Sequence, residues 1–145
     1  MKKIIFATGN EGKMKEVRMI LADLGVEILS QKEAQIFADI VEDGATFEDN
    51  AKIKASGILE VCKEKGMTDV VVLADDSGLE VDYMDKAPGV YSARFLGEDT
   101  SYVIKNQYII DQLADAKGEE RSARFVCVIA AAFENGCVET RYATI

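Results

Sequence analysis

The sequence predicts one mixed α/β domain over residues 1–145, with helices packed on a twisted central sheet. Two observations predict this fold class. Short apolar runs alternate along the chain with longer segments of helical periodicity, and hydrophobic residues make up 48% of the composition, enough for a sizeable core. The chain has one proline and shows neither an internal repeat nor a low-complexity segment, so we expect no linker.

Three segments repeat apolar residues with helical spacing: Glu11–Leu24, Thr46–Lys65 and Thr100–Ala116. Gly25 and Gly66 end the first two. The first helix is expected to bury Met14, Val17, Ile20, Leu21 and Leu24. The second is expected to bury Phe47, Ala51, Ala55, Ile58, Leu59 and Cys62. The third carries Val103, Ile104, Tyr108, Ile109 and Leu113.

Short apolar runs bounded by turn residues predict the first strands, at Lys3–Thr8 and Val26–Leu29. Val70–Ala74 is continuously apolar, so we expect a strand buried on both faces. Leu79–Tyr83 alternates apolar with acidic residues and predicts a strand with one wet face. The segment between residues 31 and 44 predicts mainly loop.

Two further strands are predicted near the end of the sequence, at Ser122–Phe133 and Val138–Thr144. They are joined at Asn135-Gly136, a pair typical of tight hairpin turns. Lys86–Val90, around the only proline, predicts a loop.

Composition excludes several classes of partner. The net charge of −9 argues against a nucleic-acid polymer, which requires a basic face, but it permits a small anion held by a few lysines. No apolar stretch approaches the ~20 residues of a membrane span. The three cysteines include no C-x-x-C pair, which predicts reduced thiols in the cytoplasm rather than a zinc or redox site.

The most informative segment is Leu73–Asp82, where an apolar strand delivers Asp75 and Asp76 into a predicted Ser77-Gly78 turn. Adjacent carboxylates repel, so one is driven toward protonation unless a cation lies between them. The chain has no histidine, and oxygen ligands suit Mg²⁺. We therefore expect Mg²⁺ against the two acids, one of which deprotonates water, with phosphate donors from Ser77 and Gly78. The alternative is a polar hairpin turn.

A second candidate segment, Thr8-Gly-Asn-Glu-Gly-Lys13, joins the first strand to the first helix. Gly9 permits close backbone approach, Asn10 is a suitable N-cap, and the free N–H groups of the first turn form an anion site. The helix dipole disfavours Lys13 there unless an anion arrives. The alternative is an ordinary capped turn. The P-loop pattern G-x-x-x-x-G-K-[ST] is missing.

The start of the second helix supplies a third set of polar residues. Thr46 and Asp49 have the spacing of a capping box, which needs no ligand. Asn50 and Lys54 are four residues apart, so they share a helix face and can reach a common partner. Asp49 is a candidate metal ligand if its oxygens are not all used by the cap.

Arg94 follows the loop at Pro88 and ends the run Pro-Gly-Val-Tyr-Ser-Ala-Arg. Its planar guanidinium suits a phosphate or carboxylate. In so acidic a chain, a surface ion pair explains the residue equally well.

Four motifs, in this order, resemble the inosine triphosphate pyrophosphatase family: T-G-N-x-x-K, T-F-x-[ED]-N-A-x-x-K-A, A-D-D-S-G-L-x-V-D and A-P-G-V-Y-S-A-R. The resemblance covers the whole chain, and the last two motifs together are highly specific. It implies Mg²⁺-dependent hydrolysis of ITP, dITP and XTP to the monophosphate and pyrophosphate, with water attacking the α-phosphorus. It also implies an elongated two-lobed α/β fold with a nucleotide cleft between the lobes, and a homodimer.

The resemblance implies roles for individual residues. Asp75 helps to bind the metal, and Asp76 accepts the proton and neighbours the metal. Asp49 stands where the family usually has a glutamate metal ligand with a longer reach. The implied substrate contacts are Thr8, Gly9, Asn10, Glu11, Gly12, Lys13, Lys54 and Ser77.

Family chains continue beyond the point that corresponds to Ile145, and the further part carries the segments that read the purine base. The sequence therefore resembles a C-terminal truncation. We expect such a chain to bind Mg²⁺-triphosphate weakly, to hydrolyse it poorly and to discriminate poorly between bases. A strand edge at its end would favour association with a second chain.

Besides the enzyme, two other functions remain open at this point. The chain could be a module that binds nucleotide and Mg²⁺ without useful turnover. Alternatively, it could be an acidic domain whose polar turns are only caps. The related Maf-type nucleotide pyrophosphatases are the runner-up family, although the A-D-D-S-G-L run fits them less well.

Overall fold

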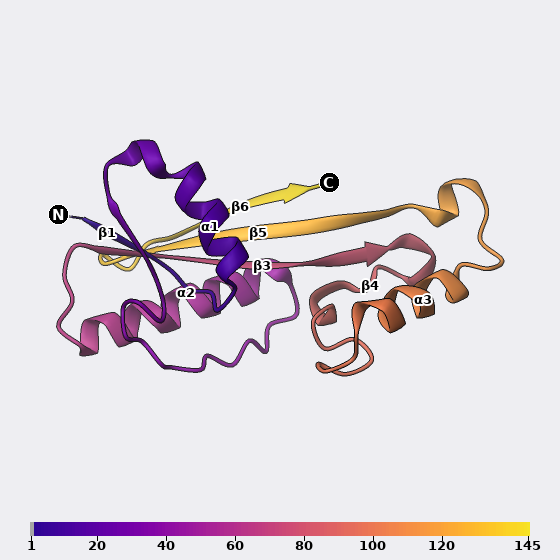
Figure 1. The fold of residues 1–145 in the computed structure, drawn as a ribbon, viewed down its shortest axis with the longest axis horizontal. Helices are drawn as coiled ribbons and strands as arrows, with labels where there is room; N and C mark the ends of the chain where they lie inside the picture. Colours follow the sequence, from indigo (N-terminus) through magenta and orange to yellow (C-terminus); the bar gives the residue numbers. More distant parts are fainter. Residues whose placement is uncertain (1) are drawn as a thin grey trace. The chain divides into compact units, whose positions relative to one another are not determined.

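The structure is a computed structural model that describes residues 2–145. It is a mixed α/β fold with helices on a central sheet, as the sequence predicts (Figure 1). The strands are β1 (Lys3–Phe6), β2 (Glu27–Ser30), β3 (Val70–Val81), β4 (Ala87–Pro88), β5 (Ala123–Phe133) and β6 (Val138–Thr144). The helices are α1 (Glu11–Ile20), α2 (Phe47–Glu64) and α3 (Tyr102–Gln112).

The sheet has the strand order β2-β1-β3-β5-β6, with β4 paired to β3 off this path. β1 is parallel to both of its neighbours, and its last residue, Phe6, lies opposite Leu73 of β3. The N–H of Ala7 still donates to the carbonyl of Leu73, at 2.8 Å. Asp75 and Asp76 therefore follow, after Ala74, the stretch of β3 that pairs with β1.

The chain divides into two compact units. Unit 1 contains the residues up to Asp76 together with Val128–Arg141, and unit 2 contains Ser77–Cys127 and Tyr142–Ile145. Strands β3, β5 and β6 each contribute residues to both units.

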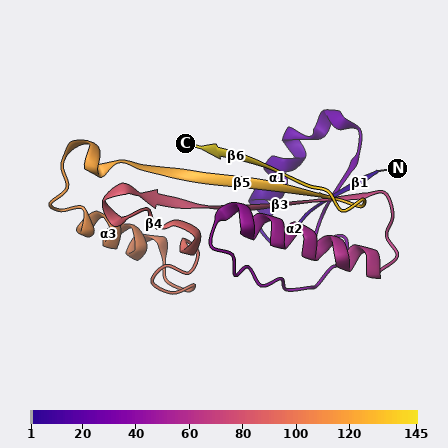
Figure 2. The same cartoon turned by 180° about the vertical axis from the view of Figure 1, so that it is seen from behind.

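In unit 1, α1 and α2 lie on opposite sides of the strands in both views (Figures 1 and 2). Thr46 caps α2 by accepting a hydrogen bond from the N–H of Asp49, as the capping-box spacing predicts. The predicted apolar face of α2 is confirmed, because all six of its residues are buried. They are Phe47, Ala51, Ala55, Ile58, Leu59 and Cys62.

Unit 2 has its own small core between β3 and α3. Val81, Ile109, Leu113 and Ala116 form its buried centre, and Leu79, Met84 and Phe95 pack against them. Lys105, on the same helix, is also buried, with 4% of its surface exposed. Helical periodicity of apolar residues does not reveal this lysine.

The predicted hairpin at Asn135-Gly136 is confirmed. Gly136 has a φ of 91°, and the N–H of Phe133 donates to the carbonyl of Cys137 at 2.9 Å. At the other end of the hairpin, Phe125 and Ile145 exchange two backbone hydrogen bonds, so β5 and β6 are antiparallel.

The predicted turn at Ser77-Gly78 is wrong, because β3 runs as one extended strand from Val70 to Val81. Gly78 does not adopt the positive φ that such a turn would use. Pairing explains the extended backbone, since β5 adjoins β3 in the sheet and β4 pairs with residues 80 and 81. The two acids therefore lie inside a strand rather than at its end.

The predicted apolar face of α1 is only partly correct. Met14 is buried, but Ile20 and Leu24 are 77% and 59% exposed. Ile20 follows Met14 by six residues, which places it about 240° around the helix. The α-helix ends at Ile20, and a short 3₁₀ turn over Ala22–Leu24 then breaks the periodicity.

Within residues 2–145, no helix combines the length and the apolar character that crossing a bilayer requires.

Candidate functional site

The site in unit 1 begins with the connection between β1 and α1. Asn10 is the N-cap, and its side chain accepts a hydrogen bond from the N–H of Lys13 at 3.0 Å. Thr8 Oγ1 accepts from the N–H of Asn10 at 3.1 Å. A Cβ on Gly12 would lie only 3.1 Å from Asn10 Oδ1, whereas one on Gly9 would meet no atom within 4 Å. The turn is therefore held by its own hydrogen bonds and has open space beside Gly9.

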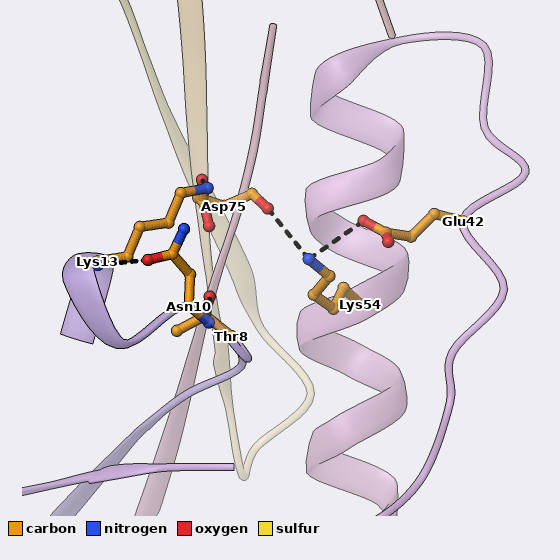
Figure 3. A network of polar contacts seen from close by, with 6 residues as sticks. All are labelled: Thr8, Asn10, Lys13, Glu42, Lys54 and Asp75. Atoms are coloured by element: carbon orange, nitrogen blue, oxygen red, sulfur yellow. Dashed lines mark hydrogen bonds and ion pairs between the residues drawn. The ribbon is translucent and has the colours of Figure 1, made fainter. Parts of the chain in front are cut away.

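Lys13 already has a partner in the protein. Its Nζ lies 2.7 Å from Asp75 Oδ2, across 62 residues of sequence (Figure 3). The side chain of Asp75 is 7% exposed, whereas that of Lys13 is 41% exposed. The structure thus brings together two predicted site residues, and it gives Lys13 a carboxylate where the sequence predicts only an arriving anion.

The side chains of Asp75 and Asp76 contact different helices. Successive side chains of a strand point to opposite faces. Asp75 meets Lys13 of α1, whereas Asp76 forms a hydrogen bond with Asn50 of α2. The two carboxylates therefore do not form the side-by-side pair that the sequence suggests.

Asp76 is the most unusual titratable group of the site. Burial raises the pKa of Asp76 from 3.8 to about 6, and the charges of Glu42 and Asp75 add to the rise. The hydrogen bond from Asn50 and the charge of Lys54 oppose it. Its Oδ2 is also the one buried side-chain oxygen or nitrogen, among the residues described, that lacks a hydrogen-bond partner. Buried polar atoms are rarely left in this state, so the oxygen marks a position for a ligand.

α2 supplies the groups around Asp76, as the spacing of Asn50 and Lys54 predicts. Asn50 is 2% exposed, and its Oδ1 accepts from the N–H of Gly44 at 2.7 Å. That contact leaves its amide nitrogen to donate to Asp76. Lys54 Nζ lies 3.4 Å from both the carbonyl of Asp75 and Glu42 Oε1 (Figure 3).

Glu42 is the site residue that sequence reasoning missed. It lies in an irregular segment, two residues before Gly44, which packs closely against α2. A Cβ on Gly44 would lie 2.7 Å from Asp49 Cβ and 2.8 Å from Asn50 Oδ1, so only glycine fits. The acidic run Glu42-Asp43 just before a glycine and a helix cap was the available signal.

Asp49 has a different environment from the one expected of a metal ligand. Its backbone N–H donates to Thr46 Oγ1 at 3.0 Å, and the residue is exposed. The charged groups that act on Asp76 are Glu42, Lys54 and Asp75, and Asp49 is not one of them. Its role as a metal ligand stays a prediction.

Three predicted substrate contacts belong to unit 2. Ser77 is exposed, and Gly78 is buried in the extended part of β3. Arg94 is exposed, with its guanidinium carbon 5.5 Å from the centroid of the Tyr91 ring. Within the described residues no carboxylate pairs with Arg94, so the alternative of a surface ion pair is not the arrangement observed.

Comparisons of the sequence and of the structure with known proteins point to the same family. The model of the Ham1 family matches residues 4–144. This chain belongs to the Ham1 family. A relative from Clostridium perfringens, named dITP/XTP pyrophosphatase, is 47% identical over 136 residues, which are 94% of this chain and 67% of that protein. A second, from Photobacterium profundum and of the same name, is 45% identical over 89% of this chain and 62% of its own length.

Solved structures of Ham1 proteins have the same fold. The Staphylococcus aureus Ham1 protein matches with a TM-score of 0.85 at 31% identity, over 99% of this chain and 70% of that one. The Coxiella burnetii HAM1 protein gives 0.84 at 35% identity, over 99% and 71%. The chain spans about two thirds of the length of the curated relatives that it matches.

Proposed function

We propose that this Ham1-family chain hydrolyses deaminated purine nucleoside triphosphates, such as ITP, dITP and XTP, to the monophosphate and pyrophosphate. The relatives at 42–47% identity carry the name dITP/XTP pyrophosphatase. The observation that carries the proposal is the unpartnered, buried Oδ2 of Asp76, a carboxylate with a pKa raised to about 6 and with Lys54 and Asn50 around it. A carboxylate of raised pKa is a suitable proton acceptor near neutral pH.

The residues around Asp75 and Asp76 have separate roles in this proposal. The N–H groups of the first turn of α1 and the ammonium of Lys13 bind phosphate oxygens, since helix N-termini favour anions. Lys54 adds a second cation on the α2 side of β3. Asn50 holds the Asp76 carboxyl in a fixed orientation, and Asp76 accepts the proton of the attacking water. Ser77, Gly78 and Arg94 remain proposed substrate contacts.

Nucleotide pyrophosphatases of this family generally need a divalent metal ion, and we propose Mg²⁺. Among residues 2–145 no three acidic or cysteine side chains cluster tightly enough to hold a metal by themselves. Asp76 and Glu42 nevertheless fit the group, since they offer hard oxygen ligands and one of those oxygens is unpartnered. Mg²⁺ commonly completes its coordination with water and substrate phosphates. When bound, it would neutralise charge on the triphosphate.

The proposal also includes the partner, the cellular location and the oligomeric state of the protein. A nucleoside triphosphate is the partner that the site suits, and the acidic chain does not suit a nucleic-acid polymer. A cytoplasmic location and a homodimer follow from the resemblance of the sequence to its family, and both are open to direct measurement.

Pyrophosphate release tests the proposal. The chain is incubated with Mg²⁺ and ITP, XTP or ATP, and Asp76→Asn is compared with Asp23→Asn, which removes an exposed carboxylate of the same unit. We expect pyrophosphate release by the wild type and by Asp23→Asn, and none by Asp76→Asn. In H₂¹⁸O, the label should enter the nucleoside monophosphate. Nucleotide binding without turnover would instead indicate a binding module, and label in pyrophosphate would contradict attack at the α-phosphorus.

A further inference from the structure

Asp75 and Asp76 have separate surroundings although they are adjacent in sequence. Asp75 Oδ2 lies 2.7 Å from Lys13 Nζ on the α1 side of β3 (Figure 3). The groups that act on Asp76 include Asn50 and Lys54 of α2 and the nearby Glu42. A role assigned to one carboxylate therefore does not transfer to the other.

Lys13 needs a compensating charge where it stands. It lies in the first turn of α1, where the positive end of the helix dipole disfavours a cation. Its long side chain is 41% exposed, so without a partner it would sample many rotamers. The Asp75 carboxylate supplies the charge and fixes the ammonium through a charge-assisted hydrogen bond.

Asp75 depends on the same contact. Its side chain is 7% exposed, and a buried carboxylate is costly unless it is paired. The pair is thus anchored on its buried side, at Asp75, and open on its exposed side, at Lys13. An ammonium has three N–H donors. Because one is used by Asp75, at most two remain for oxygens of a ligand at the first turn of α1.

We propose that Asp75 is a positioning residue, which holds the ammonium of Lys13 at the N-terminal turn for a polyphosphate, and that it is not a metal ligand. The inference rests on the proposed function and assigns different roles to Asp75 and Asp76. Asp75 acts through Lys13 on the phosphates, while Asp76 faces the metal and the water.

Binding of two separate probes tests this division. Mn²⁺ binding is followed by loss of the free-ion EPR signal, and inorganic tripolyphosphate binding by calorimetry without metal. We expect Asp75→Asn to keep its Mn²⁺ affinity within about twofold of wild type, while Asp76→Asn weakens it at least about tenfold. Tripolyphosphate should bind about three- to tenfold more weakly to Asp75→Asn.

The direction of the tripolyphosphate effect is decisive. Asp75→Asn removes a negative charge beside an anion site, and by charge alone this would tighten binding. A loss of affinity in spite of that charge change identifies positioning. Lys13→Met and the double variant should both bind as weakly as Asp75→Asn, since the residues act as a unit, and Asp75→Glu should recover part of the affinity. Tighter or unchanged tripolyphosphate binding by Asp75→Asn would overturn the inference.

A measurement on the wild-type protein covers the possibility that a variant does not fold. The side-chain ¹⁵Nζ resonance of Lys13 should stay in place when Mg²⁺ alone is added and shift when tripolyphosphate is added. A shift with Mg²⁺ alone would show that the ion displaces Lys13 from Asp75. These readouts need no turnover, so an inactive chain with the expected binding pattern would refute only the proposed hydrolysis.

Discussion

Each unit of the molecule holds a charged side chain with buried polar atoms, Lys105 in unit 2 and Asp76 in unit 1, and the two side chains differ in whether those atoms have partners. In unit 2, Lys105 Nζ donates to the carbonyl of Ala93 at 2.9 Å and lies 5.2 Å from the centroid of the Tyr102 ring. In unit 1, Asp76 keeps a buried oxygen without a partner. The difference teaches that burial of a charge is not by itself a sign of function. An unsatisfied buried atom is the more informative sign, since stability alone would have removed it.

The largest expected effect is on turnover, which should depend on Asp76. Asp76→Asn should lower kcat/KM for ITP by at least about 100-fold, because a positioned general base contributes about 10²–10⁴-fold. Its fold should be retained, as judged by urea unfolding. Equal turnover by Asp76→Asn and wild type would contradict the inference that the unpartnered oxygen of Asp76 marks a functional residue.

Lys105 should show the opposite behaviour, with a cost in stability. Lys105→Ala leaves the Ala93 carbonyl without its donor and opens space in a packed region, so we expect a loss of about 2–3 kcal/mol in the free energy of unfolding. Lys105→Met, which keeps the stem and removes the ammonium, should lose less. Urea denaturation of the three proteins measures both losses. A stable Lys105→Ala chain that has lost turnover would mean that Lys105 also has a functional role.

Gly44→Ala should have a smaller effect, and it tests whether packing on α2 places Glu42. The new Cβ would overlap Asp49 and Asn50, and overpacking of this kind costs about 1–3 kcal/mol. Thermal unfolding measures the loss, and Mn²⁺ affinity should fall with it as Glu42 moves. Gly9→Ala is the matched control for stability, since its Cβ would meet no atom within 4 Å. Equal melting temperatures for the two variants would contradict the packing explanation.

The smallest expected effect concerns the metal-free protein and depends on pH. Because the pKa of Asp76 is raised to about 6 in the folded state, its contribution to stability is present below about pH 4 and is lost as the pH rises through 6. Asp76→Asn should therefore stabilise the metal-free chain at pH 8, by on the order of 1 kcal/mol after allowance for solvent screening. At pH 4 the gain should disappear. Urea midpoints at the two pH values measure it, and a gain of equal size at both would exclude titration of Asp76 as its cause.

Local patterns in the sequence predicted much of unit 1. The buried face of α2 follows from residues three and four apart, and the caps at Asn10 and Thr46 follow from contacts across three residues. The site residues Lys13, Asn50, Lys54, Asp75 and Asp76 do gather in one unit. These features depend on nearest neighbours along the chain, which a single sequence displays directly.

The missed features depend on partners far away in the sequence. The Ser77-Gly78 turn was predicted from residue types, but β3 continues as one extended strand through these residues beside β5. The irregular segment that carries Glu42 has no periodicity, and the contact of Glu42 with Lys54 of α2 joins residues that no local pattern links. Sequence patterns do not identify Lys105 as buried, because lysine is ordinarily exposed.

By itself, the sequence determined the mixed α/β class, the caps and the acidic strand, because each rests on interactions between residues only a few positions apart. Only the tertiary structure decided that Asp75 pairs with Lys13 while Asp76 meets α2. The physical reason is that a strand directs successive side chains to opposite faces, and the helices packed on those faces supply the partners.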